Sequence, residues 1–160
     1  SPNSVFWLGK NNIAKKKFWF ELSKIVNKKY SLDLSGANKK ISNLMNYTLV
    51  KNKRFKADIK NFNLITLKSK KLRSDNFENV NFGTFLEVNL HNINHLRKYT
   101  SEKLQTITYY GTDFKSIKKF IINNKIKGID RIVPIGRAFD LTPEWDGVDI
   151  ISTLSRTIGV

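Results

Sequence analysis

The sequence contains no cysteine, so no disulfide, thiolate metal site or cysteine nucleophile can form within its 160 residues. It also lacks any apolar run approaching the roughly 18 residues that a membrane-spanning helix needs. Its opening residues, SPNSVFWLGK, have neither the basic region nor the long apolar core of a signal peptide. These absences predict a cytoplasmic protein that forms one domain or a large piece of one.

Acidic residues are scarce, at 13 against 29 lysines and arginines, and the formal net charge is +16. The excess lies in residues 1–127, which hold 26 basic and 8 acidic residues, whereas residues 128–160 hold 3 and 5. Such a surplus makes nucleic acid the first partner to consider. Most of the cations are lysines scattered among asparagine and isoleucine, whereas arginine is the residue that contacts phosphate or guanine in bidentate fashion. Nucleic acid is therefore not the expected partner.

Hydrophobic periodicity predicts strands alternating with helices. The expected strands are 4–8, 62–67, 84–90, 104–110 and 129–135. The expected helices are one capped by Asn11 or Asn12, then 36–49, 92–98, one capped by Thr112 or Asp113, and 147–157. Gly128 is expected to end the fourth helix in a left-handed conformation, and the polar residues 68–79 are expected to form a flexible loop. This alternation predicts an α/β domain whose sheet is at least partly parallel.

The spacing of apolar residues also predicts which side of each element faces the core. In strand 84–90 these positions are Thr84, Leu86, Val88 and Leu90. In the helices they are Ala14, Phe18, Leu22, Ile25, Val26 and Tyr30, then Ala37, Ile41, Leu44, Met45 and Thr48, then Phe114, Ile117, Phe120 and Ile121, and finally Val148, Ile151 and Leu154.

Few residues of the sequence suggest a catalytic or ligand-binding role. Neither phosphate-binding glycine motif, GxGxxG or GxxxxGK[ST], is present. His91 and His95 would share one face of a helix, but no third ligand is evident nearby, so no metal site is expected. Asp130 and Arg131 precede the apolar run IVPI and suggest a buried or half-buried salt bridge that fixes a loop. Trp145 could line a pocket or anchor that loop.

The stretch GIDRIVPIGRAFDLTPEWDGVDIISTLSR, residues 128–156, closely resembles the C-terminal signature of the long-chain fatty acyl-CoA reductase family. DRIVPIG, FDLTPEWDG and LSR are its distinctive parts. Upstream, LQTITYYG at 104–111 and GTFLEV at 83–88 resemble two strands of the same family. The best-known members are the reductase component of the bacterial bioluminescence fatty-acid reductase complex, a branch of the aldehyde dehydrogenase superfamily.

The resemblance implies an incomplete aldehyde-dehydrogenase-like catalytic (C-terminal) domain, with a mixed or parallel sheet flanked by helices. Residues 1–160 would form its C-terminal portion, without the cofactor-binding domain. In the family a nucleophilic cysteine is followed by Ser-Ser-Pro and a hydrophobic strand, and this chain opens with Ser1-Pro2-Asn3-Ser4 and VFWL. The cysteine is therefore expected just before Ser1, and the chain alone is not expected to catalyse.

The activity implied by the resemblance is the NADPH-dependent reduction of a long-chain acyl-CoA or acyl-protein to a fatty aldehyde, through a cysteine acyl-enzyme. The implied partners are an acyl-protein synthetase, an acyltransferase and further copies of the same chain.

The resemblance implies functional roles for residues at a few positions of this sequence. Ser1, Pro2, Arg137, Trp145 and Asp146 are candidates for the substrate pocket. Asn81-Phe82-Gly83 is similar to the family's Glu-x-Phe-Gly segment, whose glutamate holds the nicotinamide ribose. Val80 stands at the position of that glutamate, which leaves Glu78 as the candidate cofactor contact. No metal site is implied.

Two alternatives remain open. The chain could be a stand-alone basic α/β module that binds nucleic acid or another anionic surface, which predicts lysines gathered on one face and binding that weakens with salt. It could instead be a non-catalytic assembly subunit, which predicts a stable oligomer without a ligand.

Overall fold

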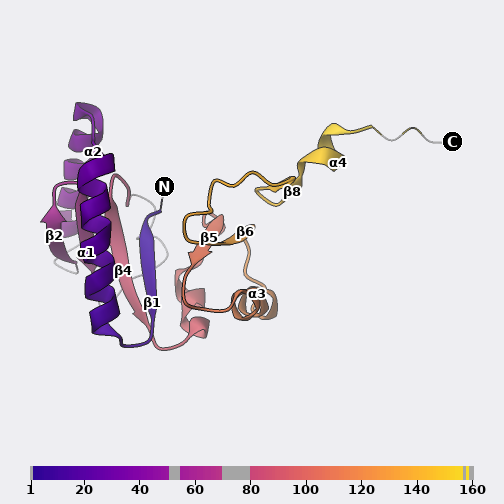
Figure 1. Ribbon diagram of the computed structural model, residues 1–160, viewed down its shortest axis with the longest axis horizontal. Coiled ribbons are helices and arrows are strands. Elements are labelled where there is room, and N and C mark those ends of the chain that lie inside the picture. The colour runs from indigo at the N-terminus through magenta and orange to yellow at the C-terminus, as the bar shows by residue number, and fades with distance from the viewer. Residues whose placement is uncertain (1, 51–54, 70–79, 157, 159–160) are drawn as a thin grey trace. The chain divides into compact units, whose positions relative to one another are not determined.

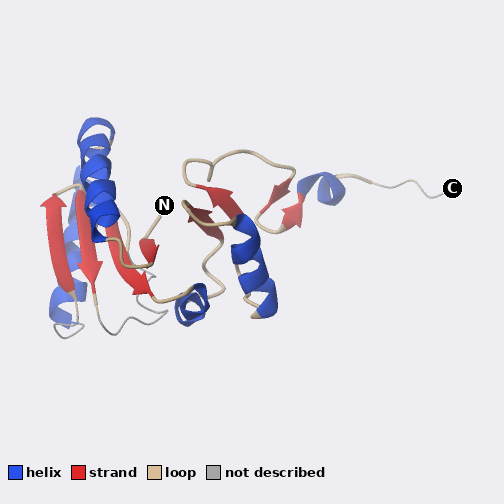
Figure 2. Cartoon of the chain, turned by 60° about the horizontal axis from the view of Figure 1, so that its bottom comes forward, coloured by secondary structure: helices blue, strands red, loops and turns tan. Residues whose placement is uncertain are grey.

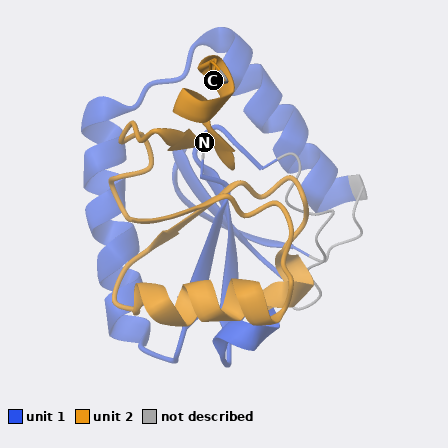
Figure 3. Ribbon diagram, turned by 90° about the vertical axis from the view of Figure 1, so that its right-hand side faces the viewer, with its two compact units in different colours: residues 1–95 blue, residues 96–160 orange. Residues whose placement is uncertain are grey.

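A computed structural model describes residues 2–50, 55–69, 80–156 and 158. The chain divides into two compact units, Ser1–His95 and Leu96–Val160, which are coloured separately in Figure 3. Each unit contains parallel strands and helices, so the predicted α/β class is confirmed. Within the described residues, no helix is both long and apolar enough to cross a membrane.

The first unit is built on a mixed sheet in the order β1-β4-β3-β2 (Figures 1 and 2). Its strands are β1, Ser4–Leu8; β2, Lys56–Asn61; β3, Leu64–Lys68; and β4, Thr84–Leu90. Strands β1 and β3 both run parallel to β4, and β2 is antiparallel to β3. The prediction of a partly parallel sheet is therefore confirmed.

The centre of this sheet forms the core. Leu64, Leu67 and Leu86 are fully buried. The four residues predicted to face inward on β4 are all buried, as the two-residue period of a strand requires. Glu87 is also buried, and its carboxylate pairs with Lys68 Nζ at 3.1 Å.

Helix α1, Asn12–Lys29, begins at the predicted cap: Asn11 Oδ1 accepts a hydrogen bond of 2.9 Å from the Ala14 amide. Its most buried residue is Trp19, whose ring centroid lies 5.7 Å from that of Phe85 on β4. Phe18, Leu22 and Val26 are half-buried as predicted, whereas Ala14, Ile25 and Tyr30 are exposed. The buried face is rotated from the predicted one because the large indole ring packs on the sheet and displaces smaller side chains.

Helix α2, Leu34–Met45, continues as the short π-helix η1, Asn46–Val50, in place of the predicted helix 36–49. Asp33 caps it by accepting a 2.7 Å hydrogen bond from the Gly36 amide. Its buried residues are Gly36 and Lys40, whereas Ile41 and Met45, predicted to face inward, are exposed. The prediction was wrong for these two residues because the helix turns its smallest residue and a lysine toward the sheet, whereas Ala37, Leu44 and Thr48 are half-buried as predicted.

Strand β2 was not predicted. Its sequence KADIKN is polar, and it lies at the edge of the sheet, where one side has no neighbouring strand. Strand β3 begins two positions later than the strand predicted at 62–67. Most of the predicted flexible loop 68–79 lies outside the described residues.

The second unit contains a parallel pair, β5, Thr106–Tyr109, and β6, Arg131–Pro134, connected through helix α3, Phe114–Asn123. The 3₁₀-helix η3, Ile93–Tyr99, replaces the predicted helix 92–98 and contains the boundary between the units. Asp113 caps α3 as predicted, and Ile117 and Phe120 are buried. Helix α3 ends before Gly128 is reached. Lys125 (φ 49°) takes the first left-handed position, and Gly128 (φ 83°) lies in the following turn.

The C-terminal residues do not form the predicted helix 147–157. A hairpin of β7, Glu144–Trp145, and β8, Val148–Asp149, precedes the short helix α4, Ile150–Leu154. Asp146 and Gly147 connect its strands with φ values of 49° and 77°, a pattern that favours a tight hairpin turn. Val148, Ile151 and Leu154, predicted to face inward, are exposed.

Asp149 begins helix α4. Its carboxylate accepts hydrogen bonds from the Ser152 hydroxyl at 2.5 Å and the Ser152 amide at 3.1 Å. The side-chain hydrogen bond from Ser152 lowers the pKa of Asp149, with the backbone bond acting in the same direction.

Candidate functional site

A tight turn at Asn81-Phe82-Gly83 leads into β4. Phe82 and Gly83 both have positive φ, 53° and 71°, and the Thr84 amide donates to the Asn81 carbonyl at 2.9 Å. The Ile65 amide donates to the Gly83 carbonyl at 3.0 Å, which joins the turn to β3. A Cβ on residue 83 would collide with the Asn63 carbonyl oxygen, so only glycine fits.

One face of α2 holds this turn in place. Lys40 Nζ donates to the Phe82 carbonyl at 2.7 Å, and Asn43 Nδ2 donates to Asn81 Oδ1 at 3.0 Å. One turn earlier on the helix, a Cβ on Gly36 would lie 2.9 Å from Asp33 Oδ1 and in van der Waals contact with the Phe82 ring, at 3.4 Å. Because residues three and four apart share a helix face, these three positions form a single row against the turn.

Lys40 is unusual for a lysine because only 1% of it is exposed. Its ammonium lies 5.5 Å from the centre of the Phe62 ring, and among the described residues no carboxylate pairs with it. Burial lowers its pKa from 10.5 to about 8. Sequence reasoning missed Lys40 because only Ala37 and the later apolar positions of this helix were predicted to face inward. No sequence pattern marks it, because its burial depends on the distant turn that contains Phe82.

Val80 and Glu78 precede the turn. Val80, which the resemblance aligns with a ribose-binding glutamate, is 4% exposed and belongs to the core. Glu78, the candidate cofactor contact, lies outside the described residues. The described part of the turn therefore supplies no carboxylate to a ribose.

Arg131 organises the loop that follows β6. Its Nη1 donates to the Ala138 carbonyl at 2.8 Å, its Nη2 donates to the Asp140 carbonyl, and its guanidinium lies over the Trp145 ring at 4.7 Å. The predicted buried Asp130–Arg131 salt bridge was wrong, because the arginine turns to main-chain carbonyls instead. The Asp–Arg pair seen here is Arg137 Nε with Asp140 Oδ2, at 2.5 Å and exposed to solvent.

The residues predicted to line the substrate pocket therefore differ in the local contacts that they make. Trp145 anchors the loop beneath Arg131, Arg137 pairs with Asp140, and Asp146 forms the hairpin turn. Pro2 is exposed ahead of β1 in the first unit. Ser1 lies outside the described residues.

Replacing Arg131 with lysine is expected to loosen this loop, because a point charge cannot bind two carbonyls and stack on an indole at once. We expect chymotryptic cleavage after Phe139 or Leu141 to become about ten-fold faster. Arg137→Gln is the matched control, since its exposed ion pair contributes little. Equal cleavage rates in the two variants would contradict the proposed clamp.

The two histidines lie together as the spacing predicted, with ring centroids 5.8 Å apart. Among the described residues, no group of three or more potential ligands is arranged to hold a metal ion.

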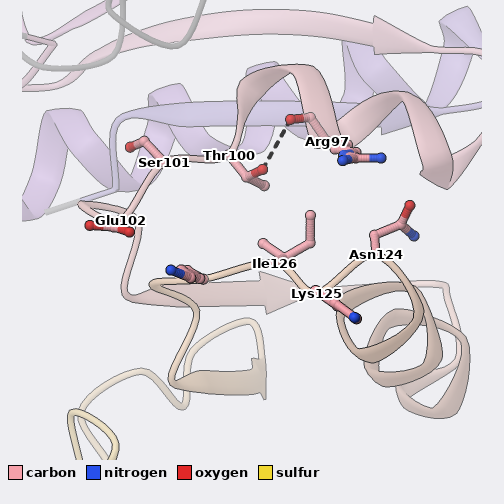
Figure 4. A pocket seen from close by; sticks show the side chains of 8 residues that line it. Arg97, Thr100, Ser101, Glu102, Asn124, Lys125 and Ile126 are labelled. Atoms are coloured by element: carbon pink, nitrogen blue, oxygen red, sulfur yellow. Dashed lines mark hydrogen bonds between the residues drawn. The ribbon is translucent and has the colours of Figure 1, made fainter.

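A polar recess of about 240 Å³ occurs in the second unit (Figure 4). It lies between η3 with the turn after it and the segment that follows α3. Gly128 lets these segments approach closely, because a Cβ there would lie 2.5 Å from the Cα of Glu102. Its lining residues are Arg97, Thr100, Ser101, Glu102, Asn124, Lys125, Ile126 and Lys127.

The recess was not predicted from the sequence. Its cations, Arg97, Lys125 and Lys127, are all exposed, so solvent screens their charges. Thr100 Oγ1 donates to the Arg97 carbonyl at 3.0 Å. No base is paired with a nucleophile among the described lining residues, so this surface lacks the geometry of a catalytic centre.

The lysines of α1 bear on the basic-module alternative. Lys15, Lys16 and Lys17 are consecutive, and consecutive helical residues point about 100° apart. They therefore spread around the helix, and Lys15 Nζ donates to Asn89 Oδ1 on β4.

Comparison with protein-family models, curated proteins and solved structures finds no match for this chain.

Proposed function

We propose that the chain is the C-terminal part of the catalytic domain of a cytoplasmic, NADPH-dependent reductase of the aldehyde-dehydrogenase type. The reaction is the conversion of a long-chain acyl-CoA or acyl-protein to a fatty aldehyde through a cysteine acyl-enzyme. An acyl-protein synthetase and an acyltransferase are the proposed partners.

The pairing of β1 with β4 supports this proposal. Ser4 is in register with Leu86, and the Leu86 amide donates to the Asn3 carbonyl at 2.9 Å. Because β1 and β4 are neighbouring parallel strands, Pro2 before β1 and the turn 81–83 before β4 lie at the same end of the sheet, where both strands begin. These two segments resemble the nucleophile and cofactor segments of the reductases, which must meet for reduction of an acyl-enzyme.

In this proposal the described residues hold the nucleophile segment and the cofactor in place. Strand β1 would carry the nucleophile segment that precedes it, and the turn 81–83 would border the cofactor. Because Val80 is buried and apolar, no cofactor contact is assigned to the described residues. Acyl transfer to a thiolate requires a cysteine that this sequence does not contain.

The first test is the mass of the native polypeptide, captured from its source with an antibody to this chain. The proposal expects a species much heavier than 18.6 kDa, with a cysteine within a residue or two before Ser1-Pro2. That species should oxidise NADPH when given a long-chain acyl-CoA and release fatty aldehyde. Alanine in place of the cysteine should abolish both.

A native species of 18.6 kDa would overturn the proposal, because the domain would then exist without its nucleophile. A heavier species with the cysteine but without acyl-CoA-dependent NADPH oxidation would refute the substrate assignment.

A further inference from the structure

The polar recess of the second unit gathers three cations in one place (Figure 4). Arg97 belongs to η3, and Lys125 and Lys127 belong to the segment that follows α3. Within the described part of the chain, none of the three forms an ion pair. Unpaired cations around one recess add their potentials there, and the sum attracts an anion.

Lys125 adopts a backbone conformation that favours glycine. Its φ is 49°, a left-handed value at which helices commonly end in glycine or asparagine. A lysine in this conformation carries a steric strain that glycine avoids. Strained positions are concentrated at binding and catalytic sites, so the strain at Lys125 favours a binding role for its ammonium over a purely structural one.

Main-chain hydrogen bonds order both walls of the recess. At the end of α3, the amide and the side-chain Nδ2 of Asn124 both donate to the Phe120 carbonyl, at 3.1 and 2.9 Å. Just beyond the two walls, the amides of Asp130 and Arg131 donate to the Gln105 carbonyl, at 2.9 and 3.1 Å. A recess with ordered walls loses little conformational entropy when a ligand binds.

Glu102 restricts which anion suits the recess. Figure 4 shows Arg97 and Asn124 at one end and Ser101 and Glu102 at the other. A carboxylate repels a bare anion but accepts hydrogen bonds from hydroxyl groups. Ser101, half-buried beside it, offers a hydroxyl of its own. A ligand that matches the whole lining therefore carries an anionic group at one end and hydroxyl groups at the other.

We propose that the recess binds a sugar phosphate. Arg97, Lys125 and Lys127 hold the phosphate, whose oxygens suit a guanidinium in bidentate fashion. Glu102 and Ser101 bind the sugar hydroxyls. The volume of about 240 Å³ lies below the roughly 300 Å³ at which pockets for drug-sized ligands begin, so the ligand is small. This binding does not depend on the reductase activity.

An NMR titration is the test, because it reports both the affinity and the place of binding. Ribose 5-phosphate is added to the ¹⁵N-labelled chain at pH 8, and the amide shifts of residues 97–102 and 124–127 are followed. We expect saturable shifts there with a Kd on the order of 1 mM, since the recess is open and solvent screens its charges. Methyl phosphate should bind at least about five-fold more weakly, because it carries the phosphate without the sugar hydroxyls.

Adenosine monophosphate distinguishes two sources of the same chemistry. Binding no tighter than that of ribose 5-phosphate would assign a free sugar phosphate. Tighter binding would assign a nucleotide whose base lies outside the recess. Both results require shifts at the same recess residues, and both support the proposal.

Substitutions identify the groups that bind. Lys125→Gly removes a cation and its left-handed strain together, so this variant should fold about as stably as the unmodified chain. It should weaken ribose 5-phosphate binding about five-fold, and Arg97→Gln about ten-fold. Lys118→Gln is the matched control because it removes the same charge from α3 outside the recess, and it should change the affinity by less than about two-fold. Glu102→Ala should bring the affinities for ribose 5-phosphate and methyl phosphate close together.

Three results would overturn the proposal. The first is the absence of shifts at the recess residues up to about 50 mM ribose 5-phosphate. The second is equal affinity of the unmodified chain for methyl phosphate, which would mean a general anion-attracting surface. The third is a Lys125→Gly variant with a lower melting temperature and unchanged binding, because Lys125 would then serve only the C-terminal end of α3.

Discussion

Replacing Gly83 with alanine is expected to destabilise the first unit by about 4 kcal/mol or more, which approaches the whole stability of a small domain. Two effects add. Residue 83 has a φ of 71°, which strains any residue with a Cβ, and that Cβ would collide with the Asn63 carbonyl. The main chain of residue 83 fixes the position of that Cβ, and the atom that it meets is a main-chain oxygen. No side-chain rotation can therefore relieve the collision. Urea unfolding followed by far-UV circular dichroism measures the loss.

Gly9→Ala is the matched control for this substitution. Gly9 also has a positive φ, of 91°, but a Cβ there would meet nothing within 4 Å. It should lose only the conformational part, about 1–2 kcal/mol. Losses of equal size in the two variants would show that the Asn63 carbonyl does not restrict the turn.

The second large effect concerns Lys40 and pH. Its folded pKa is about 8 and its ordinary value is 10.5, so above pH 8 the unfolded state binds more protons than the folded state. Stability contributed by this group therefore rises with pH across that window, as the penalty for burying its charge disappears. Relative to Lys40→Met, the free energy of unfolding of the unmodified chain should rise by up to about 3 kcal/mol between pH 7 and pH 10.5.

Lys39→Met serves as the control because Lys39 is the exposed neighbour on the same helix. Its difference from the unmodified chain should stay flat across the same pH range. A flat profile for Lys40→Met as well would mean that this amine is solvated in the folded chain.

Local signals predicted much of the framework. Strands 4–8 and 84–90 were predicted with their observed bounds, because each combines an apolar or alternating pattern with a glycine or polar boundary. Asn11 and Asp113 were recognised as caps because their side chains accept from amides that a helix start leaves free. The parallel arrangement followed from the alternation of strands and helices.

Features that depend on distant contacts could not be predicted in this way. Trp19 is buried because Phe85 lies opposite it, a relation that the helix sequence does not contain. Strand β2 is an edge strand whose polar sequence carries little periodicity. The apolar residues after Gly147 fit a helical period, but the Asp146-Gly147 turn imposed a hairpin first.

One part of the candidate site was likewise predicted from the sequence, and another part was not. The turn 81–83 was identified through its resemblance to a known segment, whereas Lys40 beneath it was not. A buried lysine that bonds a carbonyl gives no sequence pattern of its own. Trp145 was predicted to line a pocket or anchor a loop, and its contact with Arg131 supports the second alternative.

The pairing of β1 with β4 has a kinetic consequence. Ser4 and Leu86 are partners across about eighty residues of chain, and contacts between such distant segments form slowly. During synthesis, β1 leaves the ribosome long before β4 exists to pair with it. The apolar strand SVFWL must therefore wait with its main-chain hydrogen-bonding groups unpaired, which makes it a site for chaperone binding or aggregation in the nascent chain.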